Sequence, residues 1–95
     1  MAAYLIVEVE LTDPAAYEEY RRQVPPMIAA YGGRYLVRGG STKLLEGGPA
    51  PARVVVLEFP SMERLRAFYD SPEYVQVKHI RVNAARTRMF AVEGV

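Results

Sequence analysis

The side chains of this sequence best suited to recognise or transform a small molecule are one histidine, one arginine and three tyrosines. His79 is the only histidine, and an imidazole readily exchanges a proton near neutral pH. Tyr17 and Tyr20 lie three residues apart on the inward face of a predicted helix, and Tyr74 begins another. The guanidinium of Arg38 can orient an anionic head group. The sequence therefore predicts a slot between helix and sheet in which Tyr17, Tyr20, Arg38 and Tyr74 bind a small polar or anionic ligand, with His79 as candidate catalytic residue.

Each of these residues also has a purely structural interpretation. His79 shares a helical stripe with Val75 and Val82, which predicts a half-buried histidine that could simply bond a nearby carbonyl or tyrosine. The tyrosines could fill the core with their hydroxyls reaching the surface. Arg38 could instead form an ion pair at the rim of a subunit interface. A ligand-binding protein and a structural or regulatory homodimer without catalytic activity both stay open, and several polar tips on one inward surface favour the first.

Several other kinds of site find no support in the sequence. There is no cysteine, and one histidine among scattered carboxylates lacks any metal-ligand spacing, so we expect no metal and no cofactor. A haem would need His79 as its axial ligand. Ser61 and Ser71 precede predicted helices as caps, and no Ser/His/Asp order indicates a hydrolase. A net charge of +1 is too weak for nucleic-acid binding, and the mildly basic stretch 78–88 lacks the interleaved aromatic side chains of a single-strand platform.

Two glycine pairs, at 32–33 and 39–40, bracket a short run in which arginines alternate with apolar residues. A phosphate-binding loop places such glycines after a strand and before a helix. Here a helix precedes the first pair and a strand-like stretch, 41–46, follows the second. The first pair therefore predicts a helix end, where glycine adopts a left-handed conformation without strain, and the second predicts a turn or bulge.

The elements that must position these side chains alternate between strand and helix patterns over one domain, residues 1–95, of 51% hydrophobic and 24% charged composition. The order is strand, helix, strand, strand, helix, strand, which predicts an α+β, ferredoxin-like βαββαβ fold with a four-stranded antiparallel sheet and the helices on one face. We expect strands over 3–11, 34–38, 53–59 and 86–93, with 41–46 pairing in a hairpin, and helical segments over 14–31, 62–69 and 72–83.

Helices on one face leave the other face of the sheet uncovered. That face would carry several sizeable apolar side chains, worth on the order of 10 kcal/mol if buried, which predicts a homodimer through the sheet face. Glu8, Glu58, Arg34 and Arg38 suit its rim. The expected residues are Tyr4, Ile6, Glu8, Val54, Val56 and Glu58, with Leu36 or Tyr35, and Met89 and Ala91, depending on register.

The N-terminal residues of the sequence indicate where in the cell the protein is located. The apolar run 2–7 stops at Glu8 and is too short for a signal peptide or a membrane span. We therefore expect a cytoplasmic protein with no membrane partner.

A resemblance to a known family runs through two segments, TDPAAYEEYRRQVPPMIAAYGGRYLVRGG and PARVVVLEFPSMERLRAFYDSPEY. Their Tyr-x-x-Tyr, Gly-Gly-Arg, Arg-Gly-Gly, Glu-Phe-Pro-Ser and Asp-Ser-Pro-Glu-Tyr pieces resemble, in order, the domain-of-unknown-function family 1330 of the dimeric α/β-barrel superfamily. The resemblance covers nearly the whole chain. It implies the fold and the dimer and no particular reaction, because the wider superfamily includes cofactor-free monooxygenases, lactone isomerases and haem proteins.

Overall fold

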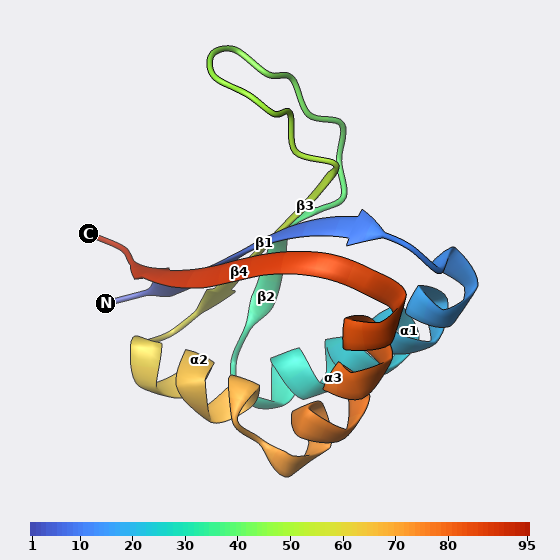
Figure 1. Ribbon diagram of the computed structural model, residues 1–95. Helices are drawn as coiled ribbons and strands as arrows, with labels where there is room; N and C mark the ends of the chain where they lie inside the picture. The colour runs from blue at the N-terminus through green and yellow to red at the C-terminus, as the bar shows by residue number, and fades with distance from the viewer.

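Four strands form one antiparallel sheet in the order β2-β3-β1-β4, and three helices cover one of its faces (Figure 1). The computed structural model describes residues 1–95. The predicted α+β, ferredoxin-like arrangement is confirmed, with α2 and α3 together in the place of the second helix. The elements are β1 (Ala3–Leu11), α1 (Pro14–Ala30), β2 (Arg34–Arg38), β3 (Arg53–Phe59), α2 (Met62–Tyr69), α3 (Pro72–Ala84) and β4 (Ala85–Glu93). None of the helices is both long enough and apolar enough to cross a membrane.

The helices begin at the predicted capping residues. The side chains of Asp13, Ser61 and Ser71 accept hydrogen bonds from backbone N–H groups three residues on, at 3.1, 3.1 and 3.2 Å. These bonds satisfy donors that the first turn of a helix leaves free. α1 continues through Pro25 and Pro26 as one helix, and Gly32 follows its end with φ +78°, the left-handed conformation expected there.

The core lies between the helices and the odd-numbered residues of β1. Leu5, Val7 and Val9 are at most 6% exposed, because successive side chains of a strand alternate between its faces. Antiparallel pairing then turns residues of β3 toward the same side. The inward side chains of β3 are Val55, Leu57 and Phe59.

The open face is built from the even-numbered residues of β1 and the residues paired with them. Ile6 lies at its centre, between Val56 of β3 and Phe90 of β4. The register corrects one expectation: Met89 and Ala91 pair with Val7 and Leu5 and therefore face the helices. The β4 residues on the open face are Arg88, Phe90 and Val92.

A bulge in β2 corrects a second expectation. Simple alternation would put Tyr35 and Val37 on one face and Arg38 on the other. The register shifts between Tyr35 and Val37, so Tyr35 pairs with Leu57 while Val37 pairs with Val56. The extra residue of the bulge turns Tyr35 and Arg38 toward the helices and leaves Val37 on the open face. Arg38 therefore lies away from the rim of the open face. It cannot form the ion pair at that rim, which was one of its two expected roles.

Residues 41–46 do not form the expected strand. Instead, residues 39–52 form an irregular arm that projects beyond the ends of β2 and β3 (Figure 1). The returning half of the arm reads Gly47-Gly48-Pro49-Ala50-Pro51. The two prolines have no N–H to donate to a neighbouring strand, and the glycines weaken any strand that contains them. Residues 41–46 therefore have no strand with which to pair.

Candidate functional site

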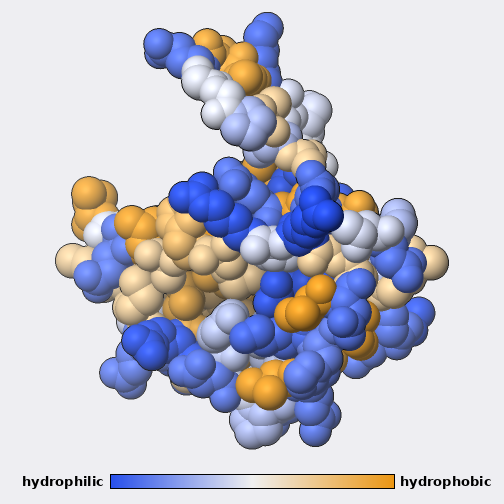
Figure 2. All heavy atoms as spheres, viewed as in Figure 1, coloured by the Kyte–Doolittle hydropathy of each residue, from blue (hydrophilic) through white to orange (hydrophobic).

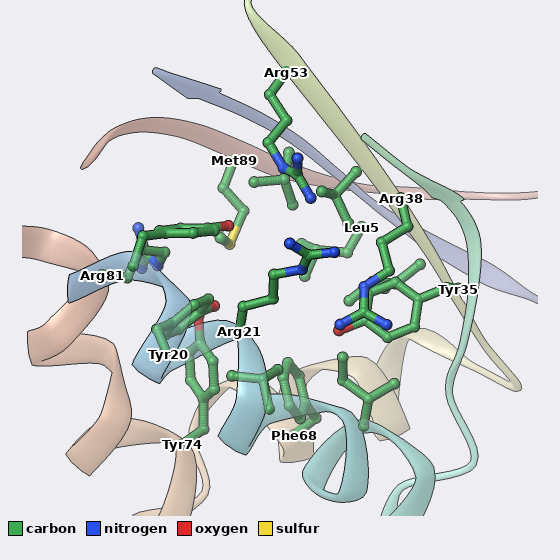
Figure 3. A pocket seen from close by; sticks show the side chains of 16 residues that line it. Leu5, Tyr20, Arg21, Tyr35, Arg38, Arg53, Phe68, Tyr74, Arg81 and Met89 are labelled. Carbon is green, nitrogen blue, oxygen red and sulfur yellow. The ribbon is translucent and has the colours of Figure 1, made fainter. Parts of the chain in front are cut away.

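A cavity of about 40 Å³ lies between the sheet and the helices, where α1, α3, β2 and β3 converge. Its floor and walls are mainly apolar, with Leu5 of β1, Phe68 of α2 and Met89 of β4 among them (Figure 3). All its polar side chains are arginines and tyrosines, and no aspartate or glutamate lines it. These residues are Arg21, Arg38, Arg53 and Arg81, and Tyr17, Tyr20, Tyr35 and Tyr74.

Each arginine comes from a different element. Arg53 reaches in from the start of β3 and Arg21 from α1, so that their guanidinium groups point toward one another (Figure 3). Arg38, turned inward by the bulge, lies with its guanidinium carbon 4.4 Å from the ring centroid of Tyr35. Arg81 of α3 lies at the opposite side of the cavity, beyond Tyr20 (Figure 3). The positive charges therefore surround the cavity.

The protein compensates little of this charge. Arg81 is only 7% exposed, yet its Nε has no hydrogen-bond acceptor on the protein, and the same holds for the Nε of Arg53. Only Arg21 has a carboxylate partner, Glu18 at 3.4 Å, and that pair is exposed to solvent. A guanidinium stays charged at any physiological pH, so burial without a counter-charge is costly. An anion in the cavity would supply the acceptors and the opposite charge.

The tyrosines add hydroxyl groups to the same space. The hydroxyl oxygens of Tyr20 and Tyr74 lie 2.8 Å apart in a buried hydrogen bond, and the ring of Tyr17 lies 5.4 Å from that of Tyr20. Burial is the main cause that raises the pKa of Tyr17, Tyr20 and Tyr35 above the ordinary tyrosine value. These three phenols therefore stay protonated at physiological pH and can donate hydrogen bonds to a ligand.

The Tyr20–Tyr74 bond is expected to show strong coupling in a double-mutant cycle. Tyr20→Phe alone leaves the buried Tyr74 hydroxyl without its partner and should lower the free energy of unfolding by about 1–3 kcal/mol. Adding Tyr74→Phe removes the orphaned group, so the double variant should be more stable than the sum of the two single losses predicts. Urea unfolding of the four proteins measures this, and additive losses would contradict it.

The raised tyrosine pKa values predict a loss of stability in alkali. Below pH 10.0, the ordinary tyrosine pKa, folded and unfolded chains hold the same phenolic protons. Above it the unfolded chain releases protons that the folded one keeps, so the free energy of unfolding should fall as the pH rises. The slope should approach about 1.4 kcal/mol per pH unit for Tyr20 and be smaller for Tyr17 and Tyr35, whose pKa values are raised less. Urea unfolding between neutral pH and alkali measures the slope, which should be shallower in Tyr20→Phe. Ionisation of all seven tyrosines near pH 10 in a folded protein would contradict the prediction.

Four of the five residues singled out in the sequence meet at this cavity. Tyr17, Tyr20, Tyr74 and Arg38 all line it, although their role in binding a ligand stays a prediction. The expected half-buried position of His79 is wrong, because His79 is exposed and does not line the cavity.

The error lies in the phase of α3. The expected inward stripe contained Val75 and Val82, which are 44% and 57% exposed, whereas the buried residues are Tyr74, Val77, Arg81 and Ala84. α3 packs against α1, where Tyr74 meets Tyr20, and this contact fixes which side turns inward.

Sequence reasoning missed Arg21, Arg53, Arg81 and Tyr35. One signal was available: Arg81 follows Tyr74 by seven residues, which is two helical turns, so the two share a face. Arg53 and Arg21 could not be found from local pattern, because they meet only when β3 and α1 pack together. No three residues of the His, Cys, Asp and Glu types gather where they could hold a metal ion.

A family model described as domain of unknown function (DUF1330) matches residues 2–95. The chain belongs to this DUF1330 family. The comparison with curated proteins finds no match.

Several solved structures are similar to this DUF1330 chain over almost its whole length. One is a protein of unknown function from Rhodopseudomonas palustris, with TM-score 0.81 at 20% identity, covering 99% of this chain and 82% of that one. Another is a dimeric ferredoxin-like protein of unknown function from Jannaschia sp. CCS1, with TM-score 0.72 at 15% identity and coverage of 99% and 100%. A third is SnoaB, a cofactor-independent oxygenase from Streptomyces nogalater, with TM-score 0.67 at 11% identity and coverage of 99% and 93%. At these identities the similarity shows a shared fold.

Proposed function

We propose that residues 1–95 form one domain that binds a small anionic molecule in the arginine- and tyrosine-lined cavity and works as a homodimer. The observation that carries the proposal is the uncompensated charge of the cavity: four arginines line it without a carboxylate, and Arg81 is buried among them with an unpaired Nε. Buried charges in proteins are normally paired, so the cavity is best suited to receive the missing negative charge from a ligand.

The size of the cavity limits the ligand. About 40 Å³ is room for two or three water molecules, enough for a carboxylate or a phenolate oxygen with its immediate neighbours. The outer arginines, Arg21 and Arg38, have partly exposed side chains that can turn outward and admit a larger body. Apolar walls around the arginines then favour a flat, apolar molecule with an anionic head group.

The chemistry available to such a ligand is also limited. Neither the guanidinium groups nor the three phenols with raised pKa can accept a proton near neutral pH, and His79 lies outside the cavity. A reaction here would therefore begin from a substrate that already carries its negative charge. By analogy of fold with SnoaB and other oxygenases, the protein would also transform the small molecule that it binds.

The homodimer would form through the open face of the sheet. Val37, Phe90 and Val92 are between 39% and 47% exposed there, around the half-buried Ile6. Two ion pairs, Arg34 with Glu58 at 2.7 Å and Arg88 with Glu8 at 3.6 Å, flank these apolar side chains. A second copy would cover the apolar centre. The ferredoxin-like protein from Jannaschia sp. CCS1 is described as dimeric, which supports a homodimer here. A cytoplasmic location stays a prediction.

A thermal-shift screen tests ligand binding against a purely structural homodimer. The probes are benzoate and salicylate, with benzamide as the uncharged match to benzoate. An anion at ten times its Kd should stabilise the protein by about 1.4 kcal/mol and raise Tm by several degrees, and benzamide should not. His79→Ala should keep the full shift, because its side chain lies outside the cavity. If no anion raises Tm, the structural homodimer is the better account of this protein.

A further inference from the structure

The arm formed by residues 39–52 has no evident role within its own chain. It rises on the side of the sheet away from the helices, well clear of the rest of the fold (Figure 1). Leu44 and Leu45 are 48% and 84% exposed, and Figure 2 shows hydrophobic atoms among hydrophilic ones along the arm. A Cβ placed at Gly40, Gly47 or Gly48 would meet no atom within 4 Å beyond its neighbours in the chain. The arm therefore holds apolar groups in solvent without any support from its own domain.

The base of the arm is nevertheless held by the sheet. The N–H of Gly39 donates to the carbonyl of Val54 at 2.9 Å, which extends the pairing of β2 with β3. Gly39 has φ +73° and lies so close to Arg53 that a Cβ there would be 2.5 Å from the guanidinium. The direction of the arm is thus set by the same strands that position Arg38 and Arg53 in the cavity.

Between the arm and the sheet lies a hollow of about 630 Å³. One wall is the returning half of the arm, Gly48 to Ala52, and the other carries two carboxylates and two guanidinium groups at the ends of β1 and β4. These form the exposed pairs Arg86 with Glu10 at 3.5 Å and Arg88 with Glu8 at 3.6 Å. Glu8 and Arg88 belong to the open face, so the hollow is continuous with the surface on which the proposed dimer forms.

We propose that the arm clasps a second copy of this chain, with Leu44 and Leu45 packed on the partner and the hollow behind the arm filled by it. The inference rests on the proposed homodimer and goes beyond it, because sheet-to-sheet contact alone would leave the arm free. A second copy suits the hollow, since a two-fold interface joins the same surface to itself and this surface carries both signs of charge. The arm is also on the side where that copy would lie.

A dilution series with arm variants tests the clasp. Leu44→Ser/Leu45→Ser removes the apolar contact, and the dimer dissociation constant should rise at least about tenfold because two leucine side chains lose burial. Lys43→Ser/Glu46→Ser, the matched control, changes the neighbouring charges and should alter the constant by about twofold or less. Sedimentation velocity measures both. A leucine variant that dimerises as tightly as the unaltered protein would overturn the clasp and leave the sheet-face dimer standing.

Cross-linking shows what the arm contacts. The chain has no cysteine, so Leu45→Cys carries a single photoreactive label on an otherwise unreactive protein. In a mixture of isotopically light and heavy subunits, the clasp should produce cross-linked peptides that combine the two isotopes. Cross-links only within one subunit would overturn the proposal. So would a larger assembly that the leucine variant reduces to an intact dimer, since the arm would then join dimers rather than subunits. A protein that is monomeric before any substitution would instead refute the dimer itself.

Discussion

Ile6→Glu is expected to turn the proposed dimer into a monomer of 10.7 kDa. Ile6 lies at the centre of the open face, directly opposite Val56 on one side and Phe90 on the other. In a face-to-face dimer a carboxylate at this position would be buried without a partner, at a cost of about 3–5 kcal/mol. Because both subunits carry the substitution, the dissociation constant should rise at least about 10²-fold, which light scattering across a range of protein concentrations measures.

The matched control for this substitution is Val75→Glu. Val75 is 44% exposed on the outer side of α3, so the same new charge is placed on the far side of the molecule from the open face. It should leave the dissociation constant unchanged. Both variants should keep their far-ultraviolet circular dichroism, because each new side chain has access to solvent in the free subunit. An Ile6→Glu protein that stays dimeric would show that the subunits meet elsewhere, and the arm would then have to be reconsidered with it.

Arg81→Met is expected to weaken ligand binding without lowering the stability of the protein. Met replaces a buried guanidinium that lacks a carboxylate partner and has an unpaired Nε, and its apolar side chain can fill the same space. The ligand-free protein should therefore keep its stability or gain about 1 kcal/mol. Affinity for the anion identified in the screen should fall about 30-fold or more, because the buried cation is lost from the site. Urea unfolding and calorimetric titration measure the two effects.

Arg66→Met is the control, since Arg66 is exposed on α2 and does not line the cavity. It should change neither ligand affinity nor stability by more than a few tenths of a kcal/mol. The opposite result for Arg81→Met, a destabilised protein with unchanged affinity, would identify Arg81 as a structural cation. The cavity would then lose its strongest argument for an anionic ligand, even if the protein is a dimer.

The sequence by itself determined most of the architecture. Alternation in β1 and β3 indicated which side chains face the core, and Asp13, Ser61 and Ser71 marked the helix starts, because these patterns depend on backbone geometry within a few residues. It also brought Tyr17 and Tyr20 to one inward helix face and placed Tyr74 on a second helix. Each of these predictions needed only the local period of a helix or a strand.

The tertiary structure decided which residues line the cavity. The bulge at Leu36 turned Arg38 inward, and no single-strand pattern shows that a strand will gain a residue relative to its partner. Packing of α3 on α1 buried the helix face that carries Tyr74 and Arg81 and left Val75 and His79 exposed. Each of these two faces carries apolar residues, so the sequence alone did not show which one would be buried. Arg21 and Arg53, far apart in the chain, became neighbours only through the fold. The physical reason is the same in each case: side-chain direction follows from local geometry, but which groups meet depends on register and packing between distant segments.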